Sequence, residues 1–273
     1  MALAEVRGDE PGIKNRQISK TAGIQPFKLD PSYRFVHEDS RGRWVGHQSD
    51  GTVASEVDAE INYCMTGQGL FVEKNNINTQ VSGFPLPALT ALGTDLAVCN
   101  QTSAQGAEYV FGGNHARGRC AFVIGTDEFF LKVKLSIADV SGADVQIGFR
   151  KVEAFQAAVA SYSDYAAIFY DGTASTAAGT TKTHTELNGA GEATTNMSLA
   201  TADADTLTAY ISVNKGGEVR YKFNGAASTA AVYYAFDSGD TVVPFIHYLN
   251  TADVAGAIDL QEFTCGLAAG DVR

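Results

Sequence analysis

Acidic residues alternate along the stretch 56-EVDAE-60, which is the arrangement in this sequence most suggestive of catalysis. Alternate residues of an extended strand share one face, so Glu56, Asp58 and Glu60 would project from the same side. A retaining glycosidase uses two such carboxyl groups, one to attack the anomeric carbon and one to protonate the leaving group. In that hypothesis Glu56 and Glu60 would take these roles, and Asp58 would tune both.

Two features of the sequence argue against this hypothesis. Sugar-cleaving clefts usually need flat aromatic platforms, and the chain has a single tryptophan, Trp44. The opposite face of the same stretch carries Val57, Ala59 and Ile61, so 52–64 is typical of a strand with one buried side and one wet side. We therefore interpret the acidic face as solvated, and we expect no catalytic residue and no enzymatic activity.

The sequence gives equally weak evidence for a metal or cofactor site. Asp171, Asp203 and Asp205 are oxygen ligands of the kind that Ca²⁺ prefers, but no loop has the crowded ligand spacing of a calcium motif. We interpret these residues as turn formers. The four cysteines show no CxxC spacing and no nearby histidine, so we expect buried free thiols, no metal site and no cofactor.

The two histidines of the C-terminal half lie in unlike contexts. His184 falls in a Thr-rich stretch, whereas His247 lies in the apolar 244-PFIHYL-249. We expect His247 to be a core or interface residue and not a base. Tyr233 and Tyr234 are adjacent, so one ring would face each side of a strand, where it could meet an oligomer or capsid contact or serve as a sugar platform.

Period-two alternation is the main structural signal. In 129-FFLKVKLSI-137 and 145-VQIGFRK-151, apolar residues recur at every second position, and the turn 138–144 separates the two. We predict an antiparallel hairpin from this pair. A second hairpin is predicted over 205-DTLTAYISVNKGGEVRYKFNG-225, where Asn214–Gly217 supply residues that tolerate positive φ.

Other segments complete an all-β pattern. Brief strands are predicted at 108–111 and 165–172, and two closing strands at 241–250 and 257–266, with a bulge near Glu262. Residues 173–204 are rich in Thr, Ala and Gly and predict loops or a thin edge strand. The only helical candidate is one short helix in 152–162. The fold class we predict is all-β, a two-sheet antiparallel jelly-roll sandwich.

The first 44 residues differ from the rest in charge and pattern. Residues 1–44 carry a net charge of +2, against −13 for residues 45–273. With scattered prolines and no period, this leader cannot form its own core. We predict an extended N-terminal arm over 1–44 and a jelly-roll domain over 45–273. The partner-binding side chains on the arm would be the apolar ones, namely Ile13, Ile18, Ile24, Phe27 and Leu29.

The C-terminal half resembles the concanavalin A-like jelly roll. The residues that carry the resemblance are the 205–225 hairpin, which ends in Asn224–Gly225, and the closing pair 244–250 and 258–266. Over about residues 65–267 the chain also resembles capsid decoration (cement) proteins of tailed bacteriophages. The motifs for that likeness are 83-GFPLPALTALGTDLAV-98, the Phe-rich 127–150, and 165-YAAIFYDG-172.

The resemblance implies a virion structural protein, which would decorate and stabilise the outer surface of a phage capsid. Its partners would be the major capsid protein and further copies of itself, as a homotrimer or homodimer. The net charge of −11 disfavours nucleic acid as a direct partner, and no apolar run is long enough for a membrane span. The N-terminal residues contain no apolar signal segment, so synthesis in the host bacterial cytoplasm is expected. The alternative is a carbohydrate-binding, lectin-like module of a virion or cell surface that binds glycans.

Overall fold

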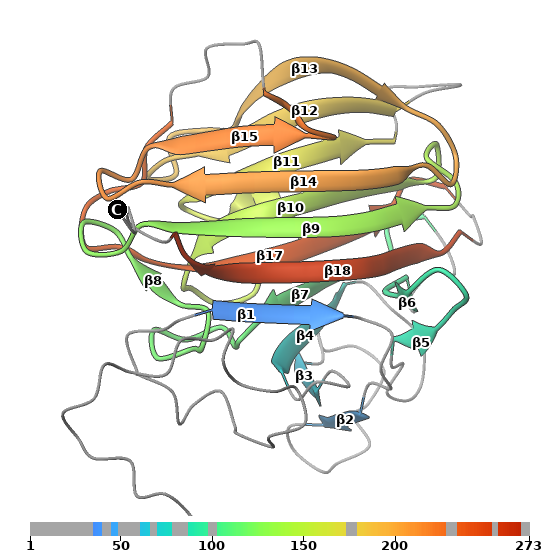
Figure 1. Cartoon of the computed structure of the whole chain (residues 1–273), viewed down its shortest axis with the longest axis horizontal. Coiled ribbons are helices and arrows are strands. Elements are labelled where there is room, and N and C mark those ends of the chain that lie inside the picture. Colours follow the sequence, from blue (N-terminus) through green and yellow to red (C-terminus); the bar gives the residue numbers. More distant parts are fainter. Residues whose placement is uncertain are drawn as a thin grey trace, which may run out of the picture. The chain divides into compact units, whose positions relative to one another are not determined.

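The alternating segments of the sequence form strands of two antiparallel sheets that pack face to face (Figure 1). The computed structural model describes residues 35–39, 45–48, 61–65, 70–77, 87–97, 103–172, 179–227, 234–252 and 256–268. The all-β sandwich predicted from the sequence is thus confirmed. Within the described ranges there is no α-helix, and none of them contains a helix long and apolar enough to cross a membrane.

The first sheet has eight strands, in the order β16-β15-β14-β9-β18-β6-β5, and β1 also pairs with β18. Its strands are β1 (Phe35–Asp39), β5 (Ala88–Leu89), β6 (Thr94–Asp95), β9 (Phe129–Ile137), β14 (Thr206–Val213), β15 (Val219–Phe223), β16 (Ala226–Ala227) and β18 (Ile258–Leu267).

The second sheet has ten strands, in the order β13-β12-β11-β10-β17-β7-β4-β3-β2, and β8 also pairs with β17. Its strands are β2 (Val45–Gln48), β3 (Ile61–Met65), β4 (Phe71–Ile77), β7 (Gly106–Phe111), β8 (Phe122–Val123), β10 (Ala143–Lys151), β11 (Tyr165–Asp171), β12 (Gly179–Glu186), β13 (Ala193–Thr201) and β17 (Thr241–Asn250). A single 3-10 turn, η3 (Val159–Ser161), follows β10.

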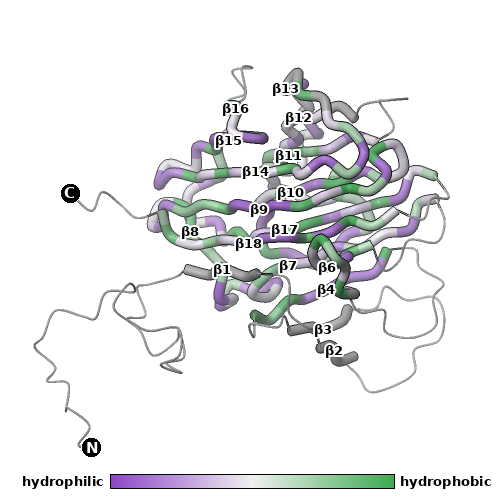
Figure 2. Tube along the Cα trace, turned by 45° about the vertical axis from the view of Figure 1, so that its right-hand side comes forward, coloured by the Kyte–Doolittle hydropathy of each residue, from purple (hydrophilic) through white to green (hydrophobic). Residues whose placement is uncertain are grey.

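The core lies between the two sheets. Alternate side chains of each inner strand are buried there, and the change of hydropathy along each strand is visible in Figure 2. Aromatic rings join the layers: Phe111 of β7 stacks on Phe263 of β18 with ring centroids 4.0 Å apart. Such pairs add to the burial that stabilises a sandwich.

The predicted hairpin over 129–151 is wrong in its pairing. β9 pairs with β14 and β18, whereas β10 pairs with β11 and β17, so the two strands belong to different sheets. Phe129 and Phe149 meet across the core with ring centroids 4.9 Å apart. An alternating pattern reports which face of a strand is buried, and two strands that face each other across a core show the same pattern as two that pair.

The other strand predictions fare better. β14 and β15 form the predicted hairpin, and Gly217 takes a φ of +83° in its turn. The register of β18 against β9 shifts between Leu260 and Glu262, which confirms the predicted bulge. The Thr-rich 173–204 region forms two strands at one edge of the ten-stranded sheet, β12 and β13, where the sequence suggested at most one.

The N-terminal boundary of the sandwich lies earlier than position 45. β1 pairs with β18, from Phe35 opposite Gly266 to Asp39 opposite Glu262, although it falls within the range predicted as the arm. The compact unit that holds all the described strands begins at Phe35. The rest of the predicted arm and the acidic stretch 52–60 lie outside the described residues. Of the cysteines, Cys120 and Cys265 are buried, as predicted.

Candidate binding cleft and the covered sheet face

The outer face of the ten-stranded sheet carries a row of polar side chains. Glu108 of β7 lies opposite His247 of β17, which lies opposite Gln146 of β10. Arg150 follows on β10, on the same face, because residues four apart on a strand point the same way. An outer sheet face is commonly solvated, yet these four residues are all buried.

Residues 152–164 cover this part of the face. Val159 of η3 and Tyr162 join a second buried apolar cluster, and Phe155 packs against it. The remaining members of that cluster are Ala121, which directly precedes β8, and five residues of the sheet, namely Val110, Tyr165, Ala167, Val243 and Phe245. The segment for which a short helix was predicted is therefore an irregular cover, and only its 3-10 turn is helical.

Beneath the cover, Arg150 and Tyr162 satisfy both carboxylate oxygens of Glu108, while Arg150 Nη2 has no hydrogen-bond partner. Arg150 Nε donates to Glu108 Oε1 at 2.5 Å, and both side chains are 0% exposed. The Tyr162 hydroxyl donates to the other carboxylate oxygen of Glu108. The Arg150 guanidinium lies over the rings of Tyr162, at 4.3 Å, and Phe155, at 5.2 Å.

Burial also sets the protonation of this group. Burial, and then the charge of Glu108, raise the pKa of Tyr162, so its hydroxyl stays protonated and able to donate. Burial lowers the pKa of His247 to about 4, so the ring is neutral near pH 7. The prediction of His247 as a core residue is thus confirmed. A closed, neutral histidine beside a fixed ion pair is not placed to act on a substrate.

His184 lies on strand β12 in the same sheet, not in a loop. Its Nε2 is 2.8 Å from both the Tyr165 hydroxyl and Glu192 Oε2, and its Nδ1 is 2.9 Å from Gln146 Oε1. Burial lowers the pKa of His184, and the hydrogen bond to Glu192 opposes that effect. Only Glu192, 56% exposed in its side chain, connects this group to solvent.

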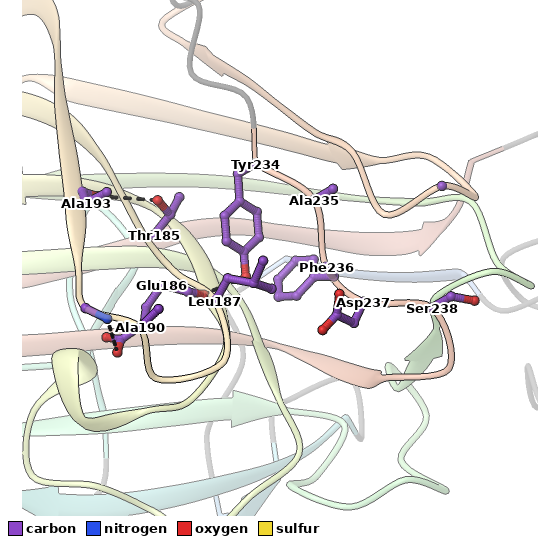
Figure 3. A pocket seen from close by; sticks show the side chains of 12 residues that line it. Thr185, Glu186, Leu187, Ala190, Ala193, Tyr234, Ala235, Phe236, Asp237 and Ser238 are labelled. Carbon is purple, nitrogen blue, oxygen red and sulfur yellow. Dashed lines mark hydrogen bonds between the residues drawn. The ribbon is translucent and has the colours of Figure 1, made fainter.

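A cleft of about 630 Å³ opens beside this group, where the end of β12 and its turn meet the 234–238 segment (Figure 3). Its size is within the range of small-molecule sites. The residues that line it are Thr185, Glu186, Leu187, Ala190, Gly191, Ala193, Gly216, Tyr234, Ala235, Phe236, Asp237 and Ser238.

Tyr234 and Glu186 organise the cleft. The Tyr234 hydroxyl donates to the backbone carbonyl of Glu186 at 2.7 Å, and its ring meets Phe236 edge-on with centroids 5.0 Å apart. Glu186 as a whole is 7% exposed. Its Oε1 accepts a hydrogen bond from the Gly191 N–H at 3.2 Å, and its Oε2 has no hydrogen-bond partner. One buried carboxylate oxygen at this cleft is therefore unsatisfied.

Three further carboxylates gather at the same end of the sandwich. Ligand oxygens of Asp164, Asp237 and Asp240 lie within 4.8 Å of one another. Lys151 Nζ is 2.7 Å from Asp240 and 3.5 Å from Asp164, so a lysine already supplies positive charge to this cluster. Asn188 donates its side-chain amide to Asp237 at 2.8 Å.

The residues singled out from the sequence do not assemble into one site. Asp171 pairs with Lys182, and Asp205 accepts the nearby Ala202 N–H at 2.9 Å, as a turn residue does. Asp203 instead accepts the N–H of the distant Val140, also at 2.9 Å. Ile13, Ile18, Ile24, Phe27 and Leu29 of the arm lie outside the described residues, as do Glu56, Glu60 and Tyr233.

The sequence interpretation missed the residues that matter most in the structure. Glu108 stands in an otherwise apolar strand, and a charge at a buried position was the available signal. Arg150 gave a weaker signal, because its strand also carries Asp144, Gln146 and Lys151. Glu186 lies in a polar, low-complexity stretch and gave no such signal. Tyr234, which was considered as a possible platform, does reach the cleft.

No protein-family model and no curated protein matches the chain. Among solved structures, the carbohydrate recognition domain of Emp47p aligns at a TM-score of 0.48 and 11% identity, over 90% of this chain and 100% of that one. An endo-acting O-glycanase of the human gut microbiota aligns at 0.45 and 9%, over 85% and 98%.

A CBM2 module of a phage protein aligns as well. This CBM2 module, from the evolved Dit of Lactobacillus casei BL23 phage J-1, has a TM-score of 0.44 and 10% identity, over 73% of this chain and 92% of that one. At this level the likeness concerns the arrangement of strands. The described part of the chain is a two-sheet antiparallel β-sandwich.

Proposed function

We propose that this chain is a non-enzymatic structural module of a phage virion that decorates the outer surface of the capsid. The observation that carries the proposal is the covered outer face of the ten-stranded sheet. A catalytic carboxylate must reach its substrate, whereas Glu108 is fully buried and committed to Arg150 and Tyr162. The broad sheet surface is built for stability and not for turnover.

The assignment to a capsid is supported by the sequence resemblance to phage cement proteins over about residues 65–267. It is also supported by the contrast between a slightly basic leader and an acidic body. In this proposal the arm docks on the major capsid protein, and the burial of its apolar side chains offsets the ordering entropy. Many copies on one shell, each a homotrimer or homodimer, reinforce the attachment through avidity.

The test is co-sedimentation of the purified full chain with capsids that lack it, compared with a variant that lacks residues 1–30. We expect the full chain to pellet with the capsids, and the truncated chain to stay folded by circular dichroism but to remain in the supernatant. If the truncated chain decorates capsids as tightly as the full chain, the arm is not the anchor. If neither binds any capsid, the decoration function itself is wrong.

A second candidate function is carbohydrate binding, and the cleft at Glu186 is the observation that favours it. The cleft combines a carboxylate with a free acceptor, aromatic residues and a volume suited to a small ligand. A glycan array with the full chain tests it. Reproducible binding to one class of sugar supports this candidate, and a blank array contradicts it while leaving capsid decoration untouched.

A further inference from the structure

The charge of the cleft limits what it can bind. Two of its lining residues, Glu186 and Asp237, are acidic, and no Lys, Arg or His lines it. Asp237 also lies within 4.8 Å of the Asp164 and Asp240 oxygens, and Lys151 is the basic residue paired with that cluster. The electrostatic potential at the cleft is therefore negative, which attracts cations and repels anions.

The unsatisfied oxygen of Glu186 indicates which group the ligand would present. Oε2 is buried and has no donor, although a buried carboxylate oxygen is costly to leave unpaired. A ligand N–H or O–H at this position would supply the missing hydrogen bond. Any donor to this carboxylate would make a charge-assisted hydrogen bond, and a positively charged donor would add Coulomb attraction to it.

The turn over residues 187–192 forms one wall of the cleft beside the Glu186 carboxylate. Its residues from Asn188 to Glu192 are exposed, and the 3.2 Å bond from Gly191 is the contact that this turn makes with the Glu186 carboxylate. This bond goes to Oε1, so Oε2 remains the oxygen that a ligand donor would meet. Ala190 and Leu187 on the same turn add apolar surface that can pack on the C–H face of a sugar ring.

We propose that the cleft binds an amino sugar, with the free ammonium group donating to Glu186. The inference rests on the second candidate function above, carbohydrate binding, and specifies its ligand class. Neutral sugars with the same linkage bind more weakly, and uronic acids are excluded. Nothing in it depends on whether the protein decorates a capsid.

The experiment compares three tetrasaccharides that share a β-1,4-linked glucose backbone, by calorimetric titration of the full chain. Chitosan tetraose carries ammonium groups, cellotetraose is neutral and a β-1,4-glucuronan tetramer is anionic. At low ionic strength we expect chitosan tetraose to bind at least tenfold more tightly than cellotetraose, and the glucuronan not to bind. The difference should shrink as salt is added, since screening weakens the attraction.

Two variants and a control locate the site. Glu186→Gln should weaken chitosan binding about tenfold or more and leave cellotetraose nearly unchanged, because it removes the charge and keeps the shape. Ala190→Trp fills the mouth of the cleft and should weaken every ligand that binds there. Glu128→Gln changes an exposed carboxylate outside the cleft and should change nothing.

The possible failures can be told apart. If none of the three tetrasaccharides binds and a glycan array is blank, carbohydrate binding is wrong and this inference falls with it. If cellotetraose or the glucuronan binds as tightly as chitosan, carbohydrate binding stands and the amino-sugar specificity is wrong. If chitosan binds but neither Glu186→Gln nor Ala190→Trp changes its affinity, the ligand lies elsewhere and the cleft is not the site.

Discussion

Two buried carboxylates differ in their hydrogen bonding, one under the covered face of the ten-stranded sheet and one at the cleft at the end of β12. Under the 152–164 cover, both oxygens of Glu108 have donors, one from Arg150 and one from Tyr162. At the cleft, Glu186 Oε2 has no donor. A carboxylate that is satisfied within the fold contributes structure, whereas one left unsatisfied beside an opening is available for a ligand.

The largest expected effect is a loss of stability when the buried ion pair of the covered face is broken. Glu108→Ala leaves the Arg150 guanidinium buried without its counter-charge, and we expect it to destabilise the protein by about 3–5 kcal/mol. Urea unfolding monitored by circular dichroism measures the change. The double variant Glu108→Leu with Arg150→Met removes both charges, so its free energy of unfolding should fall clearly less than that of Glu108→Ala. Equal losses in the single and double variants would mean that packing, and not the unpaired charge, sets the cost.

The second effect is a dependence of stability on pH. The pKa of His247 is lowered to about 4 in the folded protein, from an ordinary value near 6.5 in the unfolded chain. Between these values the unfolded chain binds the extra proton, so stability falls as the pH drops from about 6.5 to about 4. The loss attributable to His247 approaches about 3 kcal/mol.

The matched measurement is unfolding of the wild type and of His247→Gln at several pH values across that window. The difference in free energy of unfolding between the two proteins should shift by a few kcal/mol from the upper to the lower end. A constant difference across the window would show that His247 does not titrate as an isolated buried group.

The smallest effect concerns the cleft and has the opposite sign. Glu186→Gln removes one negative charge from a crowded acidic region, so we expect a slight gain in stability, of about 0.5 kcal/mol. The same substitution is expected to reduce ligand affinity, so the native Glu186 would favour binding at a small cost in stability. Thermal or urea unfolding measures the change. A fall in the free energy of unfolding of more than about 2 kcal/mol would mean that Glu186, like Glu108, stabilises the fold.

Individual segments show how far sequence alone reaches. The 205–225 hairpin was predictable because both strands alternate and the turn holds Asn and Gly, which accept positive φ. The bulge in β18 was predictable from a slip in the same alternation. In contrast, apolar and polar residues alternate equally well in β9 and β10, yet each pairs with other strands. The local pattern of a strand does not specify which strand it pairs with.

The sites were harder to predict than the strands. Glu108, Arg150 and Tyr162 come from β7, β10 and the 152–164 cover, and their sequence separations are too long for any spacing rule. The cleft combines the end of β12 with the 234–238 segment. Each residue is ordinary in its own stretch of sequence, and only the packing of distant segments gives it a role.

By itself the sequence determined the all-β class, the buried face of each strong strand and the charge difference between leader and body, because these follow from residues a few positions apart. Only the tertiary structure decided which strands pair, that 152–164 covers the sheet, and that one oxygen of Glu186 lacks a donor while both oxygens of Glu108 have one. Those outcomes depend on long-range burial, since the cost of an unpaired buried charge appears only once distant segments have closed around it.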